Sequence, residues 1–284
     1  MKWQGRRQSS NVSDRRGSGG VRRGASVGGA GLVLMLLISL IFGGPEAALE
    51  TLGTVTQQGQ QQTEYIESPE DETRAEFVSV VLADTEDVWN GIFSDYGYDY
   101  EEPTLVMYHD YVTSACGGAS SEVGPFYCPA DKTVYIDLDF FEELETKFGA
   151  SGDFAMAYVI SHEVGHHVQN LLGVMEQMQE IRAKVSQTEY NKYSVRLELQ
   201  ADYLAGVWAK GVADKGYLEI GDIDEAVNAA EAVGDDAIQK AARGYVVPDS
   251  FTHGTSEQRS YWFAKGFETG NLDSWDTFNT NEGF

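Results

Sequence analysis

The segment 160–169, with the sequence ISHEVGHHVQ, constrains this chain more than any other, because it holds three of the five histidines. His162 and His166 are four residues apart, and Glu163 lies between them. On a helix, residues four apart project from one face, so these two imidazoles can bind the same metal ion. The HExxH spacing is typical of zinc hydrolases, in which the glutamate accepts a proton from a zinc-activated water. The segment therefore predicts a helix that carries a Zn²⁺ site.

A third metal ligand is expected on a later helix. The stretch RLELQADYLAG places Glu198 and Asp202 four residues apart, hence on one helical face. We predict that Glu198 completes a His₂Glu site and that Asp202 accepts a hydrogen bond from a ligating histidine. The alternative is a solvated acidic face, but apolar neighbours argue against it, since buried acids need partners. Those neighbours are Leu197, Leu199, Ala201 and Leu204.

The other histidines have weaker assignments. His253 lies just before an expected helix, and Arg259 follows it. We predict that His253 donates a hydrogen bond to the developing oxyanion, with Arg259 as a second candidate donor; a helix-cap contact is the alternative. His167 points about 100° away from His166, so we expect it behind the site. His109 ends an expected strand and is interpreted as a surface or packing residue.

Apolar periodicity predicts an α+β fold, mostly helical with a small sheet. Helices are expected over 75–93, 139–149, 151–173, 194–211, 222–244 with a break near Gly234, and 255–267. Ser151 or Asp153 is expected to cap the helix 151–173, and Thr255 the last one. Strands are expected over 103–109 and 132–138, the latter beside the substrate. Gly165 in mid-helix indicates close packing of a neighbouring segment.

Charge is divided unevenly along the chain. Residues 1–24 hold seven basic residues and one acid, whereas the whole chain has a formal net charge of −25. A strongly acidic body would repel phosphates, which argues against a nucleic-acid partner.

The stretch 24–45 has no charged residue and predicts a transmembrane anchor over 25–45. A cleaved signal or a buried core helix are the alternatives. The expected organisation is a basic cytoplasmic leader (1–24), the anchor, a flexible tether (46–73) and a zinc metallopeptidase domain (74–284). The positive-inside rule then places a single-pass protein in the bacterial inner membrane, with its domain on the periplasmic or extracellular side.

The two cysteines, Cys116 and Cys128, lie in a stretch of small residues. An even number of cysteines in an exported domain predicts one disulfide. Two free thiols in a reduced compartment are the alternative. A zinc site built on them is disfavoured, because the chain has no CxxC pair.

Taken together, these segments resemble the bacterial neutral zinc metallopeptidase family, whose members are membrane-anchored. The matching stretches include SACGGASSEVGPFYCPADKTVYIDL, GDFAMAYVISHEVGHHVQNLLG, RLELQADYLAGVWA and VVPDSFTHGTSEQR. The resemblance implies a zincin-like fold, zinc at His162, His166 and Glu198, and Glu163 as the catalytic acid/base. This chain departs from many relatives at Tyr203 and near Trp275, where they carry cysteines.

Three functions are consistent with these patterns. The first is a zinc metallopeptidase that hydrolyses protein or peptide substrates with Glu163 as general base. The second is a zinc-binding scaffold or adaptor of the cell envelope without proteolysis, which would not need Glu163 beside the ligands. The third is a zinc hydrolase that acts on a non-peptide amide.

Overall fold

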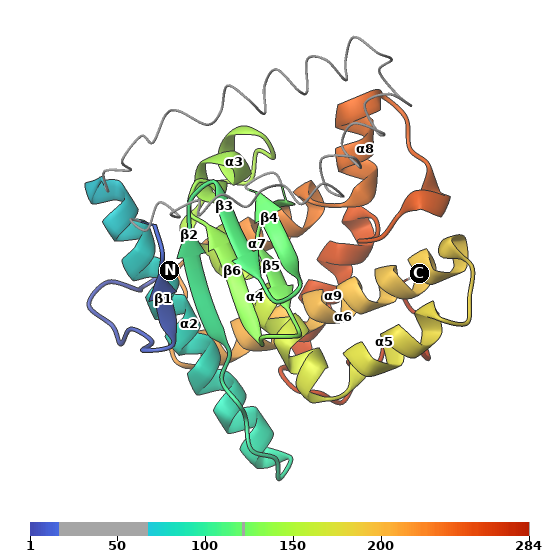
Figure 1. The fold of residues 1–284 in the computed structure, drawn as a ribbon. Coiled ribbons are helices and arrows are strands. Elements are labelled where there is room, and N and C mark those ends of the chain that lie inside the picture. Colours follow the sequence, from blue (N-terminus) through green and yellow to red (C-terminus); the bar gives the residue numbers. More distant parts are fainter. Residues whose placement is uncertain (17–67, 121–122, 284) are drawn as a thin grey trace. The chain divides into compact units, whose positions relative to one another are not determined.

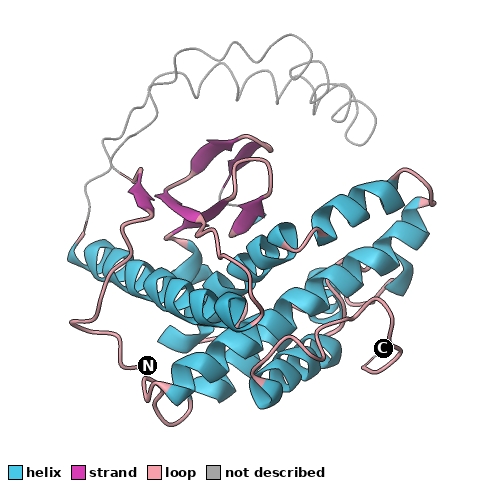
Figure 2. Cartoon of the chain, turned by 90° about the horizontal axis from the view of Figure 1, so that it is seen from below, coloured by secondary structure: helices cyan, strands magenta, loops and turns pink. Residues whose placement is uncertain are grey.

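The computed structural model describes residues 1–16, 68–120 and 123–283. Met1–Asp14 and the chain from Ser68 onward form one compact unit. In this unit the strands gather on one side of a larger group of helices (Figures 1 and 2). The α+β architecture, mostly helical with a small sheet, is as predicted.

The main sheet has the strand order β1-β2-β6-β5. β1 (Val12–Asp14), β2 (Thr104–Tyr108) and β6 (Thr133–Asp137) run parallel, and β5 (Phe126–Cys128) is antiparallel to β6. β2 and β6 confirm the two predicted strands. Because β6 is paired on both sides, it has no edge for a substrate, and the prediction that 132–138 pairs with one is wrong.

Both faces of β2 and β6 are covered, which explains why these strands are continuously apolar. Leu105 and Ile136 point into the core shared with the helices. Val106 and Tyr135 point to the other face, where a two-stranded hairpin covers them. The hairpin consists of β3 (Tyr111–Ser114) and β4 (Gly117–Ser120).

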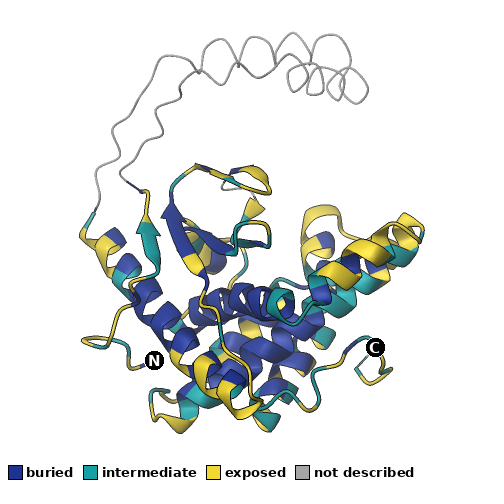
Figure 3. Cartoon of the chain, turned by 60° about the horizontal axis from the view of Figure 1, so that its bottom comes forward, coloured by how far each residue is buried: buried dark blue, intermediate teal, exposed yellow. Residues whose placement is uncertain are grey.

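Helix α4 (Asp153–Leu171) is buried along almost its whole length. It packs on α6 (Gln187–Asp214), α7 (Asp222–Ala232) and α2 (Pro69–Asp95), and α9 (Ser256–Thr269) packs on α6. Figure 3 shows that buried residues concentrate where these helices meet. The remaining helices are α3 (Phe140–Thr146), α5 (Val174–Arg182), α8 (Asp235–Arg243) and the 3₁₀ turn η3 (Pro248–Ser250).

Several local signals mark the observed helix ends. Thr255 caps α9 and forms a capping box with Gln258, as predicted. Gly173, with a φ of 82°, separates α4 from α5. The break expected near Gly234 separates α7 from α8.

The predicted cap of α4 is wrong. Neither Ser151 nor Asp153 occupies the N-cap position; Gly152 does, with a φ of 107° that side chains rarely permit. The N–H group of Phe154, in the first turn of α4, donates instead to the Glu225 carboxylate, 3.0 Å away. A side chain from another helix therefore replaces the local cap.

Residues 1–14 belong to the same unit as the chain from Ser68 onward, although the sequence analysis assigned them to a separate leader. β1 pairs with β2, Trp3 packs edge-on against Phe77, and Arg7 forms an ion pair with Glu86 at 2.8 Å. The expected topology placed leader and domain on opposite sides of a membrane. Strand pairing between β1 and β2 is incompatible with that separation.

The fold prediction also included a transmembrane helix, and this part is corrected. In the described ranges, no helix combines the length and the apolar character needed to cross a membrane. The segment 25–45 and most of the tether 46–73 lie outside the described residues. Described structure resumes at Ser68, which caps α2, a few residues before the expected domain start at 74.

Candidate active site

The three residues of the HExxH motif lie on the buried helix α4, and their side chains reach a cleft. His162, Glu163 and His166 are 6%, 8% and 9% exposed, so only their tips are accessible to solvent. All three line a cavity of about 470 Å³. The structure thus places the motif at the bottom of a cleft and not on a solvated helix surface.

Glu198 on α6 approaches both histidines. Its Oε2 lies 3.2 Å from His162 Nε2 and its Oε1 lies 3.5 Å from His166 Nε2. Zinc bonds of about 2.05 Å in a tetrahedron separate neighbouring ligand atoms by about 3.4 Å. The donor set of two imidazoles and one carboxylate, with ligand atoms within 4.8 Å of one another, therefore fits a zinc ion with a fourth position left for water or substrate.

Close packing of α4 on α6 makes this approach possible. A methyl group added at Gly165 would lie 3.0 Å from the carbonyl oxygen of Ala201 and 3.3 Å from its Cα. The glycine therefore lets the two backbones come close. This confirms the interpretation of Gly165 as a packing residue.

Asp202 supports His162 at Nδ1, the ring nitrogen that does not face Glu198. Its Oδ1 lies 2.8 Å from His162 Nδ1, which leaves Nε2 of that imidazole directed at Glu198. Tyr158 donates to the same Oδ1 at 2.6 Å, and Arg259 donates to both oxygens at 2.9 and 3.0 Å. Burial by itself raises the pKa of Asp202. The neighbouring Arg259 and His162 lower it by more, so that the pKa of Asp202 is about 2. Asp202 is therefore a carboxylate that fixes the imidazole tautomer.

Arg259 serves this network instead of reaching out as a free donor. Its guanidinium is 4% exposed and is bound by Asp202, by the Tyr158 hydroxyl at 3.1 Å and by the Val233 carbonyl at 3.2 Å. It still lines the cleft, but its hydrogen bonds are directed at the support of His162.

His166 has its own support, which sequence reasoning missed. Its Nδ1 lies 2.8 Å from the side-chain oxygen of Gln169, and Gln169 donates in turn to Gln200 and to the Leu197 carbonyl on α6. Gln169 follows His166 by three residues on the same helix, so the sequence contained a usable signal. Both histidines thus have their Nδ1 engaged and their Nε2 directed at Glu198.

Glu163 is next to the cluster of His162, His166 and Glu198 but is not part of it. Burial raises the pKa of its carboxyl group, while the two neighbouring imidazoles lower it. A raised pKa makes a carboxylate a better proton acceptor near neutral pH.

His253 lines the same cleft from the loop before α9. Asp235, at the start of α8, lies 3.3 Å from His253 Nδ1 and accepts the backbone N–H groups of Thr252, His253 and Gly254. The hydrogen bond to Asp235 raises the pKa of His253. Its side chain is half-exposed, so the ring is accessible from the cleft. Nothing in the sequence pattern pointed to Asp235.

The two remaining histidines lie apart from the ligand cluster. His167, on α4, is fully buried, with Nδ1 2.9 Å from the Tyr127 hydroxyl and Nε2 2.6 Å from the Glu101 carbonyl. His109 follows β2 and lies 3.3 Å from Asp139 and 3.6 Å from Asp137.

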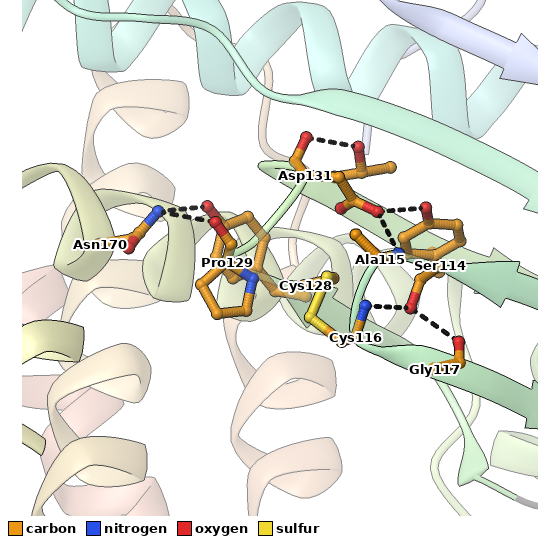
Figure 4. Close-up of a disulfide and its surroundings, with 11 residues drawn as sticks. Ser114, Ala115, Cys116, Gly117, Cys128, Pro129, Asp131 and Asn170 are labelled. Carbon is orange, nitrogen blue, oxygen red and sulfur yellow. Dashed lines mark hydrogen bonds between the residues drawn. A yellow bond between two sulfur atoms is a disulfide. The ribbon is translucent and has the colours of Figure 1, made fainter. Parts of the chain in front are cut away.

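One wall of the cleft is β5 and the loop before it, from Val123 to Tyr127. In the described part of the chain, β5 pairs with β6 alone and is the edge of the sheet. The predicted disulfide between Cys116 and Cys128 is confirmed, and it ties the end of β5 to the turn of the β3–β4 hairpin (Figure 4). A hydrogen bond of 2.8 Å from the Ala115 N–H group to Asp131 supports the same turn.

Comparison with known proteins assigns this chain to one family. The family model described as "Putative neutral zinc metallopeptidase" matches residues 1–278. Protein YpfJ of Escherichia coli (strain K12) is 48% identical over 286 residues, which cover 98% of this chain and 99% of that protein. Protein Rv2575 of Mycobacterium tuberculosis (strain ATCC 25618 / H37Rv) is 47% identical over 191 residues, covering 63% of this chain and 64% of that protein. No solved structure matches significantly. The extent of the family match, together with the convergence of the HExxH histidines on Glu198, shows that the chain belongs to the putative neutral zinc metallopeptidase family.

Proposed function

We propose that this protein is a zinc-dependent endopeptidase that hydrolyses peptide bonds in extended segments of protein substrates. The observation that carries the proposal is the convergence of His162, His166 and Glu198 beside Glu163, at the bottom of a cleft with a free strand edge. Zinc bound there would polarise both the attacking water and the substrate carbonyl.

The chain's own residues have distinct roles in the proposed reaction. Glu163 accepts a proton from the attacking water and later delivers it to the leaving amine. His253, held by Asp235, donates a hydrogen bond to the oxyanion that develops on the carbonyl oxygen. Asp202 and Gln169 keep the two ligating imidazoles in place during these steps.

Substrate binding is proposed along β5. An edge strand can bind an extended peptide by main-chain hydrogen bonds, which recognise any sequence. β5 is well placed for this, because its residues line the cleft that contains Glu163. The free edge favours a peptide over a small non-peptide amide, which has no strand to add.

The experiment that tests the proposal compares the full chain with Glu163→Gln, both loaded with zinc. We expect the variant to retain one zinc per chain by mass spectrometry and to cleave an unfolded protein about 10²- to 10⁴-fold more slowly. Equal rates with equal zinc content would remove Glu163 from the mechanism.

A second pair of variants tests the ligand assignment. Glu198→Ala is expected to lose zinc on dialysis, whereas Glu189→Ala, on the exposed start of the same helix, is expected to retain it. Stoichiometric zinc in Glu198→Ala would show that the third ligand lies elsewhere.

A further inference from the structure

Three side chains with metal-binding atoms meet at the carboxyl ends of β2 and β6. His109 directly follows β2, Asp137 is the last residue of β6, and Asp139 comes two residues later. Because β2 and β6 are neighbouring parallel strands, their carboxyl ends lie at the same edge of the sheet. None of the three residues is among those that line the described cleft around Glu163. The cluster is therefore separate from the proposed catalytic centre.

The spacing within this cluster fits a metal ion. His109 Nδ1 lies 3.3 Å from Asp139 Oδ1 and 3.6 Å from Asp137 Oδ1. One ligand atom from each of the three residues lies within 4.8 Å of the other two. Zinc bonds of about 2.05 Å in a tetrahedron separate neighbouring ligand atoms by about 3.4 Å. The distances are thus close to those among the three proposed catalytic ligands, which are 3.2 and 3.5 Å.

The two carboxylates of the cluster lack a strong cationic partner. The side chains of His109 and Asp137 are only 5% and 2% exposed. In the described part of the chain, neither Asp137 nor Asp139 forms an ion pair with a lysine or an arginine, whereas the buried Asp202 is paired with Arg259. A protonated His109 would neutralise only one of the two negative charges. Buried charges in proteins are paired or coordinate metals, so this cluster favours a divalent cation.

The Asp137 carboxylate is held in a fixed orientation. Its Oδ1 accepts the Asp139 N–H group at 3.0 Å and its Oδ2 accepts the Asp110 N–H group at 3.1 Å. Hydrogen bonds of this kind commonly orient ligating carboxylates.

A buried hydroxyl next to Asp137 is an independent sign of a ligand. Tyr108 lies opposite Asp137 in the β2–β6 pair, so the two side chains project from the same face of the sheet. The Tyr108 hydroxyl is buried and has no hydrogen-bond partner among the described residues. Buried polar groups are normally hydrogen-bonded, and a water molecule on a metal at Asp137 would supply a partner.

We infer that His109, Asp137 and Asp139 form a second metal site, which binds Zn²⁺. The imidazole favours zinc over calcium and magnesium, which prefer oxygen ligands. The Asp139 side chain is 54% exposed, so the ion can enter from solvent and keep water as its fourth ligand. The site has one imidazole where the proposed catalytic site has two, so we expect it to bind zinc more weakly and to release it on dialysis.

The second zinc would tie the end of β2 to the connection between β6 and α3. Phe140, the first residue of α3, follows Asp139 directly and lines the catalytic cleft. A metal at this position would therefore steady one wall of the cleft without taking part in the reaction. The inference does not depend on the peptidase proposal.

The test is a calorimetric titration of the dialysed full chain with Zn²⁺. We expect the chain to bind one further zinc ion beyond the zinc that it retains on dialysis. Asp139→Asn should raise the Kd for this further ion at least about 100-fold, the upper end of the effect of losing a residue that only supports a ligand. The fold should persist, because the Asp139 side chain forms no capping hydrogen bond with α3.

Asp110→Asn is the matched control. Asp110 is exposed and adjoins His109, but it is not one of the three proposed ligands. Its φ of 64° is a conformation that asparagine tolerates, and its N–H group to Asp137 is kept. The two variants remove the same charge, so Asp110→Asn should bind the further zinc nearly as tightly as the unchanged protein.

Thermal unfolding gives a second readout. Added zinc at about 100 times the Kd should raise the Tm of the dialysed chain by on the order of 5 °C, and Asp139→Asn should lack this shift. Excess Ca²⁺ should not displace the further zinc.

Three results would overturn the inference: no further zinc in the unchanged protein, an unchanged Kd in Asp139→Asn, or equal weakening in Asp139→Asn and Asp110→Asn, which would indicate charge attraction alone. Displacement of the zinc by Ca²⁺ would overturn the assignment to zinc. A dialysed chain that retains no zinc would count against the catalytic site only, and the comparison of the two variants would still decide the second site.

Discussion

Breaking the buried ion pair between Arg259 and Asp202 by removing one partner should cost nearly as much unfolding free energy as removing both partners. Arg259→Met removes the guanidinium and keeps an unbranched apolar side chain of similar length. Asp202, which is 0% exposed, then loses two of its four hydrogen bonds and its arginine counter-charge. Removing one partner of a buried pair costs about 3–5 kcal/mol, because the other charge is left uncompensated.

The contacts that Asp202 keeps in Arg259→Met place the expected loss of stability near the lower limit of this range. Tyr158 still donates to Asp202, and His162 still lies 2.8 Å away. We therefore expect Arg259→Met to lower the free energy of unfolding by about 3 kcal/mol. Asp202→Asn should cost a similar amount, because it leaves the guanidinium buried without its carboxylate. The double variant should cost about 3–4 kcal/mol, well below the sum of the two, since residues in one network are coupled.

Urea unfolding of chelator-treated protein measures these free energies without the contribution of bound zinc. Lys192→Met, which removes an exposed ion pair with Glu189, is the control and should change stability by less than about 1 kcal/mol. Competition with a chelator should also show about 10- to 100-fold weaker zinc binding for Arg259→Met, because the support of His162 is loosened. Strict additivity in the double variant would refute the view that the two residues act as one buried pair.

Three further predictions concern stability. Replacing Cys116 and Cys128 together by alanine should lower the urea unfolding free energy by about 3 kcal/mol in the chain-entropy model, and an unchanged value would refute the link. Gly206→Ala should destabilise by about 2 kcal/mol or more, because the methyl group would overlap the Phe263 carbonyl. Gly91→Ala, at an exposed position inside α2 with free space around it, should stabilise by about 0.5 kcal/mol. Burial raises the pKa of Asp137 to about 6, so the folded state holds its proton more tightly than the unfolded chain. Stability should therefore fall by on the order of 3 kcal/mol as pH rises from about 4 to about 6, and Asp137→Asn should lack this loss in pH-dependent unfolding.

The elements that could be predicted from the sequence are those whose residues show a pattern within the element itself. The period of apolar residues predicted α4 and α6, and the four-residue spacing placed His162 with His166 and Glu198 with Asp202. Thr255 and Gln258 predicted the start of α9, because a capping box is a local hydrogen-bonded unit. Strands β2 and β6 were recognised because they are rich in β-branched and aromatic residues and are bounded by proline or charged turns.

Short strands could not be predicted. β1 has only three residues, one of them an acid, and no periodicity can be read from so few. Its strand conformation depends on pairing with β2, which is about ninety residues away in sequence. The same applies to β5, and it explains why β6 was given the role of the edge. The docking of residues 1–14 was not predicted, because this segment is basic and Arg7 pairs with Glu86, a buried acid of α2 that the sequence does not mark.

The residues that hydrogen-bond to the histidines of the site also fall into a group that the sequence could predict and a group that it could not. Gln169 lies three residues from His166 and was open to prediction, whereas Asp235 lies eighteen residues from His253 and reaches it only through the folding of a loop. The contact depends on how α8 and α9 are placed relative to each other, and core packing determines that placement.

The helices that carry the proposed ligands are tightly packed, whereas β5 and the loop that carries His253 are less constrained. The three proposed ligands are on two helices whose backbones touch at Gly165, and α6 is in turn held against α9 at Gly206 and Gly266, where added methyl groups would overlap the opposing backbone. A site whose ligands are on packed helices keeps its geometry before any metal or substrate arrives. The opposite wall consists of β5, a short strand with one free edge, and of the half-exposed His253 on a loop. Substrate binding would complete the pairing of β5 and cover His253. In the proposed function the helices would fix the position of the metal, and the sheet edge would align the peptide beside it.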